Sequence, residues 1–169
     1  MARALVVYES HWGNTEQVAR EVAAGVADVM PVDVAAVGAA PPDLHGVDLL
    51  VAGGPTHAFS MTRESTRRDA RGQGGTSGTL ERGLREWFSE LPRSSAAVAT
   101  FDTRVSAVRH LPGSAARSAG REARRHGLRR AAPPESFWVE GTEGPLLDGE
   151  LARARAWGRA VAEAVGSHG

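Results

Sequence analysis

The chain contains no cysteine, which excludes disulfides, thiolate metal ligands, iron–sulfur clusters and cysteine nucleophiles. Lysine is absent as well, because all 20 residues counted as lysine or arginine are arginine. Schiff-base chemistry, a covalent link to pyridoxal phosphate and a Walker-type phosphate loop all need lysine and are therefore excluded. Any redox chemistry must come from a bound cofactor.

Long apolar runs are missing too. The first run, residues 4–8, follows Met1-Ala2-Arg3 directly and is too short for a signal peptide or a membrane span. We therefore expect a cytoplasmic protein with no membrane span. The length of 169 residues and the 41% apolar composition suit one core, so we expect a single domain over residues 1–169.

Positive charge is scarce in the first part of the chain and dense later on. The formal net charge is zero, yet residues 104–130 carry eight arginines against Glu122 alone. Four of these follow helical spacing, namely Arg117, Arg121, Arg124 and Arg125. They form either a solvated face or a docking surface for an acidic partner or an anionic metabolite. Aromatic interleaving and a recognised nucleic-acid module are both absent, so we expect no nucleic acid partner.

Short apolar runs alternate with stretches of helical periodicity, which is typical of an α/β fold with a parallel sheet. The expected strands are residues 4–8, 32–37, 49–53, 96–101 and 136–140. The expected helices are residues 14–29, 80–91, a segment from a cap at Ser114 to about 127, and a segment capped by Asp148 that runs to about 165. Their inward faces are Val18, Val22 and Val26; Leu84, Trp87, Phe88 and Leu91; and Leu151, Ala154, Trp157 and Val161. Residues 38–47 are too short and proline-broken for a full helix.

Residues 55–79 form an unusually long connection after the third expected strand, with four glycines between positions 72 and 78. Loops of this length in compact domains are usually functional or disordered, and ligands of open α/β sheets bind at the carboxyl ends of the strands. The loop is therefore a candidate lid. Its arginines, Arg63, Arg67, Arg68 and Arg71, are either solvated or positioned for dinucleotide phosphates or a partner's acidic groups.

The segment between the first strand and the first helix has the composition of an anion site. Ser10, Asn14 and Thr15 supply side-chain donors, Gly13 permits close backbone approach, and the helix N-terminus adds free N–H groups. Alternatively, the segment is an ordinary turn in which Ser10 and Thr15 cap the helix. The longer run favours the anion site, because Val6-Val7-Tyr8, Ser10, Gly13, Thr15, Ala19 and Val22 follow the order and spacing of the flavodoxin signature for the phosphate of flavin mononucleotide (FMN).

The chain thus resembles the flavodoxin family, and the resemblance extends to two further loops, residues 53–59 and 100–104. It implies a flavodoxin-like three-layer sandwich with a five-stranded parallel sheet in the order 2-1-3-4-5. It also implies that FMN binds without covalent attachment, with its phosphate on the first loop and its ring between the other two. The cofactor-binding residues so implied are Ser10, His11, Trp12, Gly13, Asn14, Thr15, Pro55, Thr56, His57, Phe59, Thr100, Phe101, Asp102 and Arg104. Phe101 is alternatively a core residue and His57 a plain hydrogen-bonding residue.

The function so indicated is electron transfer, with a redox partner protein or NAD(P)H as the electron donor. An FMN-dependent NAD(P)H:quinone-type oxidoreductase is the first alternative, and a flavin-free partner-binding module is the second. No catalytic residue and no metal ligand is singled out by the sequence.

Overall fold

The structure is a computed structural model, and it describes all residues except 1, 57–60, 64, 69–82 and 168–169. Within this part of the chain, six strands form one sheet. They are β1 (Ala4–Tyr8), β2 (Val32–Ala36), β3 (Leu49–Pro55), β4 (Ala97–Val105), β5 (Arg129–Arg130) and β6 (Glu135–Val139). Their order is β2-β1-β3-β4-β5, β6 also pairs with β4, and all these pairings are parallel. The predicted order 2-1-3-4-5 is confirmed.

The fifth position of the sheet differs from the prediction of one strand. The predicted strand at 136–140 corresponds to β6, and the short β5 precedes it. β5 pairs with Ala97 and Val98, whereas β6 pairs with Phe101 to Val105, so the two lie end to end along one edge of β4. Pro133 and Pro134 stand between them. Because proline has no N–H to donate to the ladder, the strand is interrupted there.

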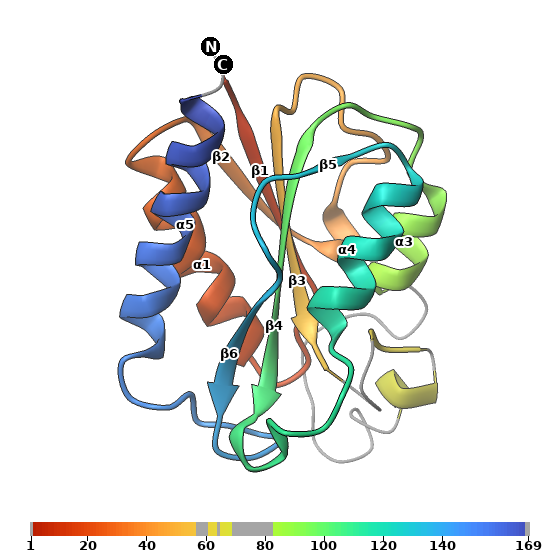
Figure 1. Cartoon of the computed structure of the whole chain (residues 1–169). Coiled ribbons are helices and arrows are strands. Elements are labelled where there is room, and N and C mark those ends of the chain that lie inside the picture. Colours follow the sequence, from red (N-terminus) through yellow and green to blue (C-terminus); the bar gives the residue numbers. More distant parts are fainter. Residues whose placement is uncertain (1, 57–60, 64, 69–82, 168–169) are drawn as a thin grey trace.

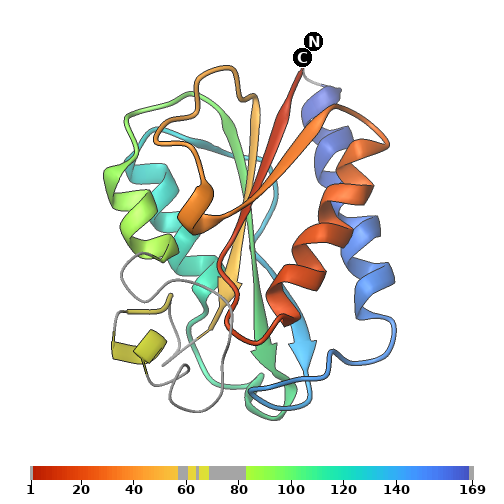
Figure 2. The same cartoon turned by 180° about the vertical axis from the view of Figure 1, so that it is seen from behind.

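Helices cover both faces of the sheet, which gives the predicted three layers (Figures 1 and 2). The first face carries α1 (Asn14–Ala27) and α5 (Glu150–Gly166), and the second carries α3 (Leu84–Glu90) and α4 (Ala115–Arg125). The predicted inward residues of the first helix and of residues 84–91 are all buried. Residues 38–47 contribute only to the short 3₁₀ turn η1 (Val37–Ala39), as expected. Among the described residues, no helix is long and apolar enough to cross a membrane.

The structure confirms one of the two predicted helix caps and contradicts the other. Ser114 caps α4, because its hydroxyl accepts the backbone N–H of Arg117 at 3.1 Å. The prediction that Asp148 caps the last helix is wrong, since Gly149 occupies the N-cap position with φ 82°. Leu151 was predicted to face inward and is 37% exposed. The first turn of α5 is instead anchored by Glu150, whose carboxylate accepts the N–H of Trp138 at 2.8 Å.

The helices α1 and α5 approach each other closely because glycines stand at their contact. A Cβ atom added at Gly158 would lie 2.9 Å from the carbonyl carbon of Val22 and closer still to its oxygen. A Cβ atom added at Gly25 would lie 2.8 Å from the backbone nitrogen of Arg159. Neither position has room for a methyl group, so any larger residue must separate the helices.

We therefore predict that Gly158→Ala lowers the free energy of unfolding by about 1–3 kcal/mol, because the added methyl group overlaps the backbone of α1. Urea unfolding followed by circular dichroism measures the change. Gly120→Ala in α4 is the matched control, since its Cβ would meet only the hydroxyl of Thr100 at an ordinary 3.5 Å. Equal stability of the two variants would show that the helices are not in tight contact.

Candidate functional site

The loops that follow β1, β4 and β6 meet at the carboxyl edge of the sheet, at the bottom of Figure 1. β3 ends at the same edge, which is where open α/β sheets bind ligands. Of the residues implied by the resemblance, His57 and Phe59 lie outside the described residues. Of the other twelve, Thr56 directly follows β3, and the rest belong to β3, β4, the first loop or the start of α1.

The first loop leaves backbone donors pointing out of the start of α1. The hydroxyl of Ser10 accepts the N–H of Gly13 at 3.2 Å and that of Glu16 at 3.3 Å. Gly13 is the N-cap, adopts φ 91° and offers no side chain as a cap. In the part of the chain that the structure describes, no acceptor is found for the N–H groups of Asn14 and Thr15. Such a pair of donors at a helix N-terminus suits an anion.

Trp12 adds a third donor to this loop. Its indole Nε1 is buried, and it has no hydrogen-bond partner among the described residues. A buried donor without an acceptor costs about 1–3 kcal/mol. An oxygen atom of a ligand bound at this loop would remove that cost, so the donors present fit an oxyanion such as a phosphate.

Side chains also tie the first loop to its neighbours. The hydroxyls of Thr15 and Thr103 lie 2.8 Å apart and share a hydrogen bond, which joins α1 to β4. The amide of Asn14 lies against Gly144, where an added Cβ would come within 2.9 Å of its nitrogen. The contact of the loop after β6 with the first loop was not predicted from the sequence. The Gly144-Pro145 pair, which marks a turn shortly before the last helix, was the available signal.

A buried carboxylate lies beneath the first loop. Glu9 accepts a hydrogen bond from the backbone N–H of Leu84 at 2.8 Å, and its other oxygen contacts His11 Nε2 at 2.6 Å. The hydroxyl of Thr62 also donates to Glu9. The imidazole of His11 is thus turned toward Glu9, and the side chains of both residues are almost fully buried. Burial alone would raise the pKa of the Glu9 carboxyl, but the hydrogen bonds from His11, Thr62 and Leu84 outweigh it and hold that pKa below its ordinary value.

Arg67 joins the same buried cluster, although the sequence placed it in a solvated or ligand-binding group. The residue is 1% exposed, and its guanidinium forms an ion pair with Glu86 at 2.6 Å. It also donates to the hydroxyl of Thr62 at 3.0 Å. Its charge is satisfied inside the protein, which makes burial tolerable. Both readings of Arg67 are therefore wrong, and it anchors part of the long segment after β3 to α3.

Thr56 and Asp102, implied as cofactor-binding residues, hold the start of α4 with their side chains. The Asp102 carboxylate accepts the Thr56 hydroxyl and the N–H of Ala116, each at 3.1 Å. The Thr56 hydroxyl accepts the N–H of Ala115 at 3.0 Å, and the Thr100 hydroxyl donates to the carbonyl of Ala116 at 2.7 Å. Burial raises the pKa of the Asp102 carboxyl, and hydrogen bonds offset this only in part. The side chains of Thr56, Thr100 and Asp102 therefore attach the start of α4 to the ends of β3 and β4.

Phe101 is fully buried in β4, whereas Arg104 lies near the end of the strand and is partly exposed. The ring of Phe101 is fully buried and packs edge-on against Phe137 and Trp157, which is the core position left open as its alternative. Arg104 donates to the carbonyl of Leu111 at 3.0 Å and lies 5.7 Å above the ring of Trp138. Arg109 lies 6.0 Å from the same ring. Two positive charges thus flank the end of β6.

The Glu9 cluster predicts a pH-dependent loss of stability. Because its folded-state pKa is depressed, Glu9 contributes stability above its unfolded-state pKa and loses that contribution as the pH falls through the folded value. Glu9→Gln should therefore lower the free energy of unfolding by about 1–3 kcal/mol at pH 7. This gap, the difference in free energy of unfolding between the wild type and the variant, should narrow as the pH falls. Denaturant unfolding between neutral and acidic pH measures the gap. The exposed Glu140→Gln serves as control, and a gap that does not change with pH would contradict the ionised cluster.

The fold has clear counterparts among solved structures. An archaeal flavodoxin superposes with a TM-score of 0.66 at 18% identity, over 97% of this chain and 99% of that one. Flavodoxin 1 from Bacillus cereus gives a TM-score of 0.68 at 14% identity, over 96% and 98% of the two chains. A flavodoxin, WrbA-like protein from Agrobacterium tumefaciens gives 0.63 at 17% identity, over the full length of both.

Comparison of the sequence alone gives no such counterpart: no family model matches it, and no curated protein gives a significant match. Identities of 14–18% establish architecture and not activity. The strand order, the helices on both faces and the near-complete superpositions agree with one another. This chain has the flavodoxin-like fold.

Proposed function

We propose that this protein binds FMN without covalent attachment at the carboxyl edge of its sheet and serves in electron transfer. The observation that carries the proposal is a set of donors in the first loop that find no acceptor among the described residues, on a fold shared with flavodoxins. These donors are the indole N–H of Trp12 and the backbone N–H groups of Asn14 and Thr15.

The phosphate would bind to this loop without any positively charged side chain. The N-terminus of α1 supplies partial positive charge, and the two free backbone N–H groups supply direct hydrogen bonds. Open space surrounds the position that a Cβ would take at Gly13, so the backbone is accessible there. Ser10 keeps the loop in shape through the N–H groups of Gly13 and Glu16.

The ring would lie between the loops that follow β3 and β4. Thr56 and Asp102 bond to the start of α4 and so hold the backbone at these two positions before any ligand arrives. Thr103 connects the same edge to Thr15 of the phosphate loop. FMN, when bound, supplies the capacity to accept and release electrons, which no side chain of this cysteine-free chain provides.

The electron donor distinguishes two forms of this proposal. In the favoured form, a redox partner protein docks at the carboxyl edge. In the alternative, the protein is an NAD(P)H:quinone-type oxidoreductase, and Arg104 and Arg109 beside Trp138 favour it because their positive charge suits an anionic dinucleotide.

Trp12→Phe tests the phosphate site directly, because it removes the indole donor and keeps an aromatic ring. We predict that FMN binds about tenfold more weakly to this variant, as expected for one lost hydrogen bond to a charged group. Quenching of flavin fluorescence gives the dissociation constant of FMN for the wild type and for the variant. Riboflavin, which lacks the phosphate, is the matched control ligand and should bind both proteins equally. If Trp12→Phe weakened the binding of FMN and riboflavin equally, Trp12 would contact the flavin ring or have a structural role, and it would not bind the phosphate.

An anaerobic spectrum of the FMN-loaded protein tests the electron donor. We predict that NADPH alone leaves the flavin absorbance unchanged, whereas a separate reductase or dithionite bleaches it. Bleaching by NADPH alone would support the oxidoreductase instead. Failure of the purified protein to bind FMN at all would overturn the proposal and leave a partner-binding module.

A further inference from the structure

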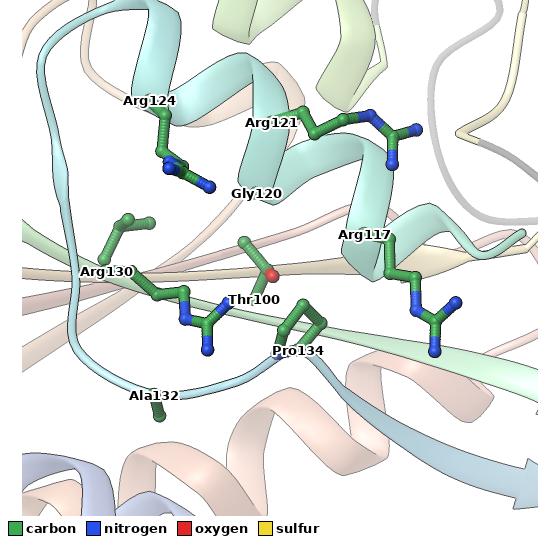
Figure 3. A pocket seen from close by; sticks show the side chains of 9 residues that line it. Thr100, Arg117, Gly120, Arg121, Arg124, Arg130, Ala132 and Pro134 are labelled. Atoms are coloured by element: carbon green, nitrogen blue, oxygen red, sulfur yellow. The ribbon is translucent and has the colours of Figure 1, made fainter.

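A pocket lies beside the interruption of the fifth strand, away from the first loop. It has a volume of about 340 Å³ and lies between α4 and the middle of β4. Val98 and Thr100 of β4 line it, together with Ala132 and Pro134 from the break between β5 and β6. Figure 3 shows Thr100, Ala132 and Pro134 on the side opposite α4. The pocket thus lies where Pro133 and Pro134 end the pairing with β4.

Arginine dominates the polar lining of this pocket. Arg117, Arg121 and Arg124 come from α4 and Arg130 comes from β5. No carboxylate lines the pocket. Glu122, the acid on α4, is engaged with Arg125 at 3.0 Å and with His126 at 3.5 Å. In the described residues, none of the four lining arginines forms an ion pair with an acid.

Two of these side chains enter the hollow from different elements. In Figure 3, Arg124 descends from α4 and Arg130 extends from the opposite side, with its guanidinium beside Thr100 and Pro134. Arg117 and Arg121 lie along the other flank of the helix, where Arg121 donates to the Ser118 hydroxyl at 3.2 Å. Four positive charges around one hollow repel each other, and a bound anion would relieve that repulsion. The planar donor sets of guanidinium groups match phosphate oxygens.

We propose that this pocket binds a small organic anion with two or more phosphate groups, of the nucleoside diphosphate class. The arginines would hold the phosphates, and the apolar surface of Val98 and Pro134 would contact the remainder of the ligand. The volume lies at the lower end of the range for small-molecule sites. A concave shape favours such a ligand over the surface of an acidic protein. The proposal does not depend on flavin binding. Of the lining residues, only Thr100 is also implied for FMN, and its hydroxyl donates to the carbonyl of Ala116.

Calorimetric titration of the full chain with ADP, inorganic pyrophosphate and adenosine tests the site. ADP and pyrophosphate should bind with one-to-one stoichiometry and adenosine should not. Arg124→Gln and Arg130→Gln should each weaken ADP binding about tenfold or more. Arg155→Gln is the matched control, since Arg155 is exposed on α5, on the other face of the sheet, and its replacement should leave the affinity unchanged.

Three results would overturn the proposal. The first is absence of saturable binding, and the second is equal weakening by Arg155→Gln, which would indicate unspecific charge attraction. The third is tighter binding of a hexaglutamate peptide than of ADP, which would assign the surface to an acidic protein partner. Repeating the ADP titration with excess FMN separates the two sites: unchanged affinity supports a distinct pocket, and competition would place ADP at the carboxyl edge instead. Failure of FMN to bind would leave the ADP result intact.

Discussion

The buried carboxylate of Glu9 is the interaction on which the geometry of the carboxyl edge depends. It joins the end of β1, the segment around Thr62 and the first residue of α3, which are far apart in the sequence. An ionised group in such a place is stable only while several donors surround it, so loss of one donor loosens all three segments. Arg67 and Glu86 extend the same cluster by a second buried contact. The loop above Glu9 is therefore held in position by polar contacts within the protein and needs no ligand to form.

This arrangement divides the polar groups of the edge into two classes. His11, Thr56, Thr100 and Asp102 use their side chains within the protein, on Glu9 or on the start of α4. Trp12 and the first backbone N–H groups of α1 have no acceptor among the described residues. Groups of the first class preorganise the site, and groups of the second class remain for a ligand to satisfy. Preorganised donors bind an anion with little loss of conformational entropy, so a site without a positively charged side chain can still bind a phosphate.

Most of the fold could be predicted from the sequence, because apolar periodicity reports directly which side of an element is buried. The runs at 4–8 and 49–53 correspond to β1 and the start of β3, and Val18, Val22 and Val26 face the core as expected. The wrong predictions concern residues whose contacts lie far away in the sequence or depend on such contacts. Nothing near Arg67 in the sequence indicates that Glu86 will neutralise it, and Leu151 has the right spacing but lies where α5 is held by Glu150. Within the site, the engagement of Asp102 with the start of α4 also depends on contacts across the chain.

The use of arginine alone for positive charge has a consequence for how the two candidate sites relate. The first loop offers only dipoles and neutral donors, which suit the modest charge of one phosphate monoester. The pocket beside α4 concentrates guanidinium groups, which suit a ligand of higher charge. β4 contributes to both candidate sites, since Thr100 lines the pocket and Thr103 contacts Thr15 at the start of α1. α4 begins at the carboxyl edge, where Asp102 accepts the N–H of Ala116, and its outer turns carry three arginines of the pocket. The same helix therefore places neutral donors and acceptors at one candidate site and positive charge at the other.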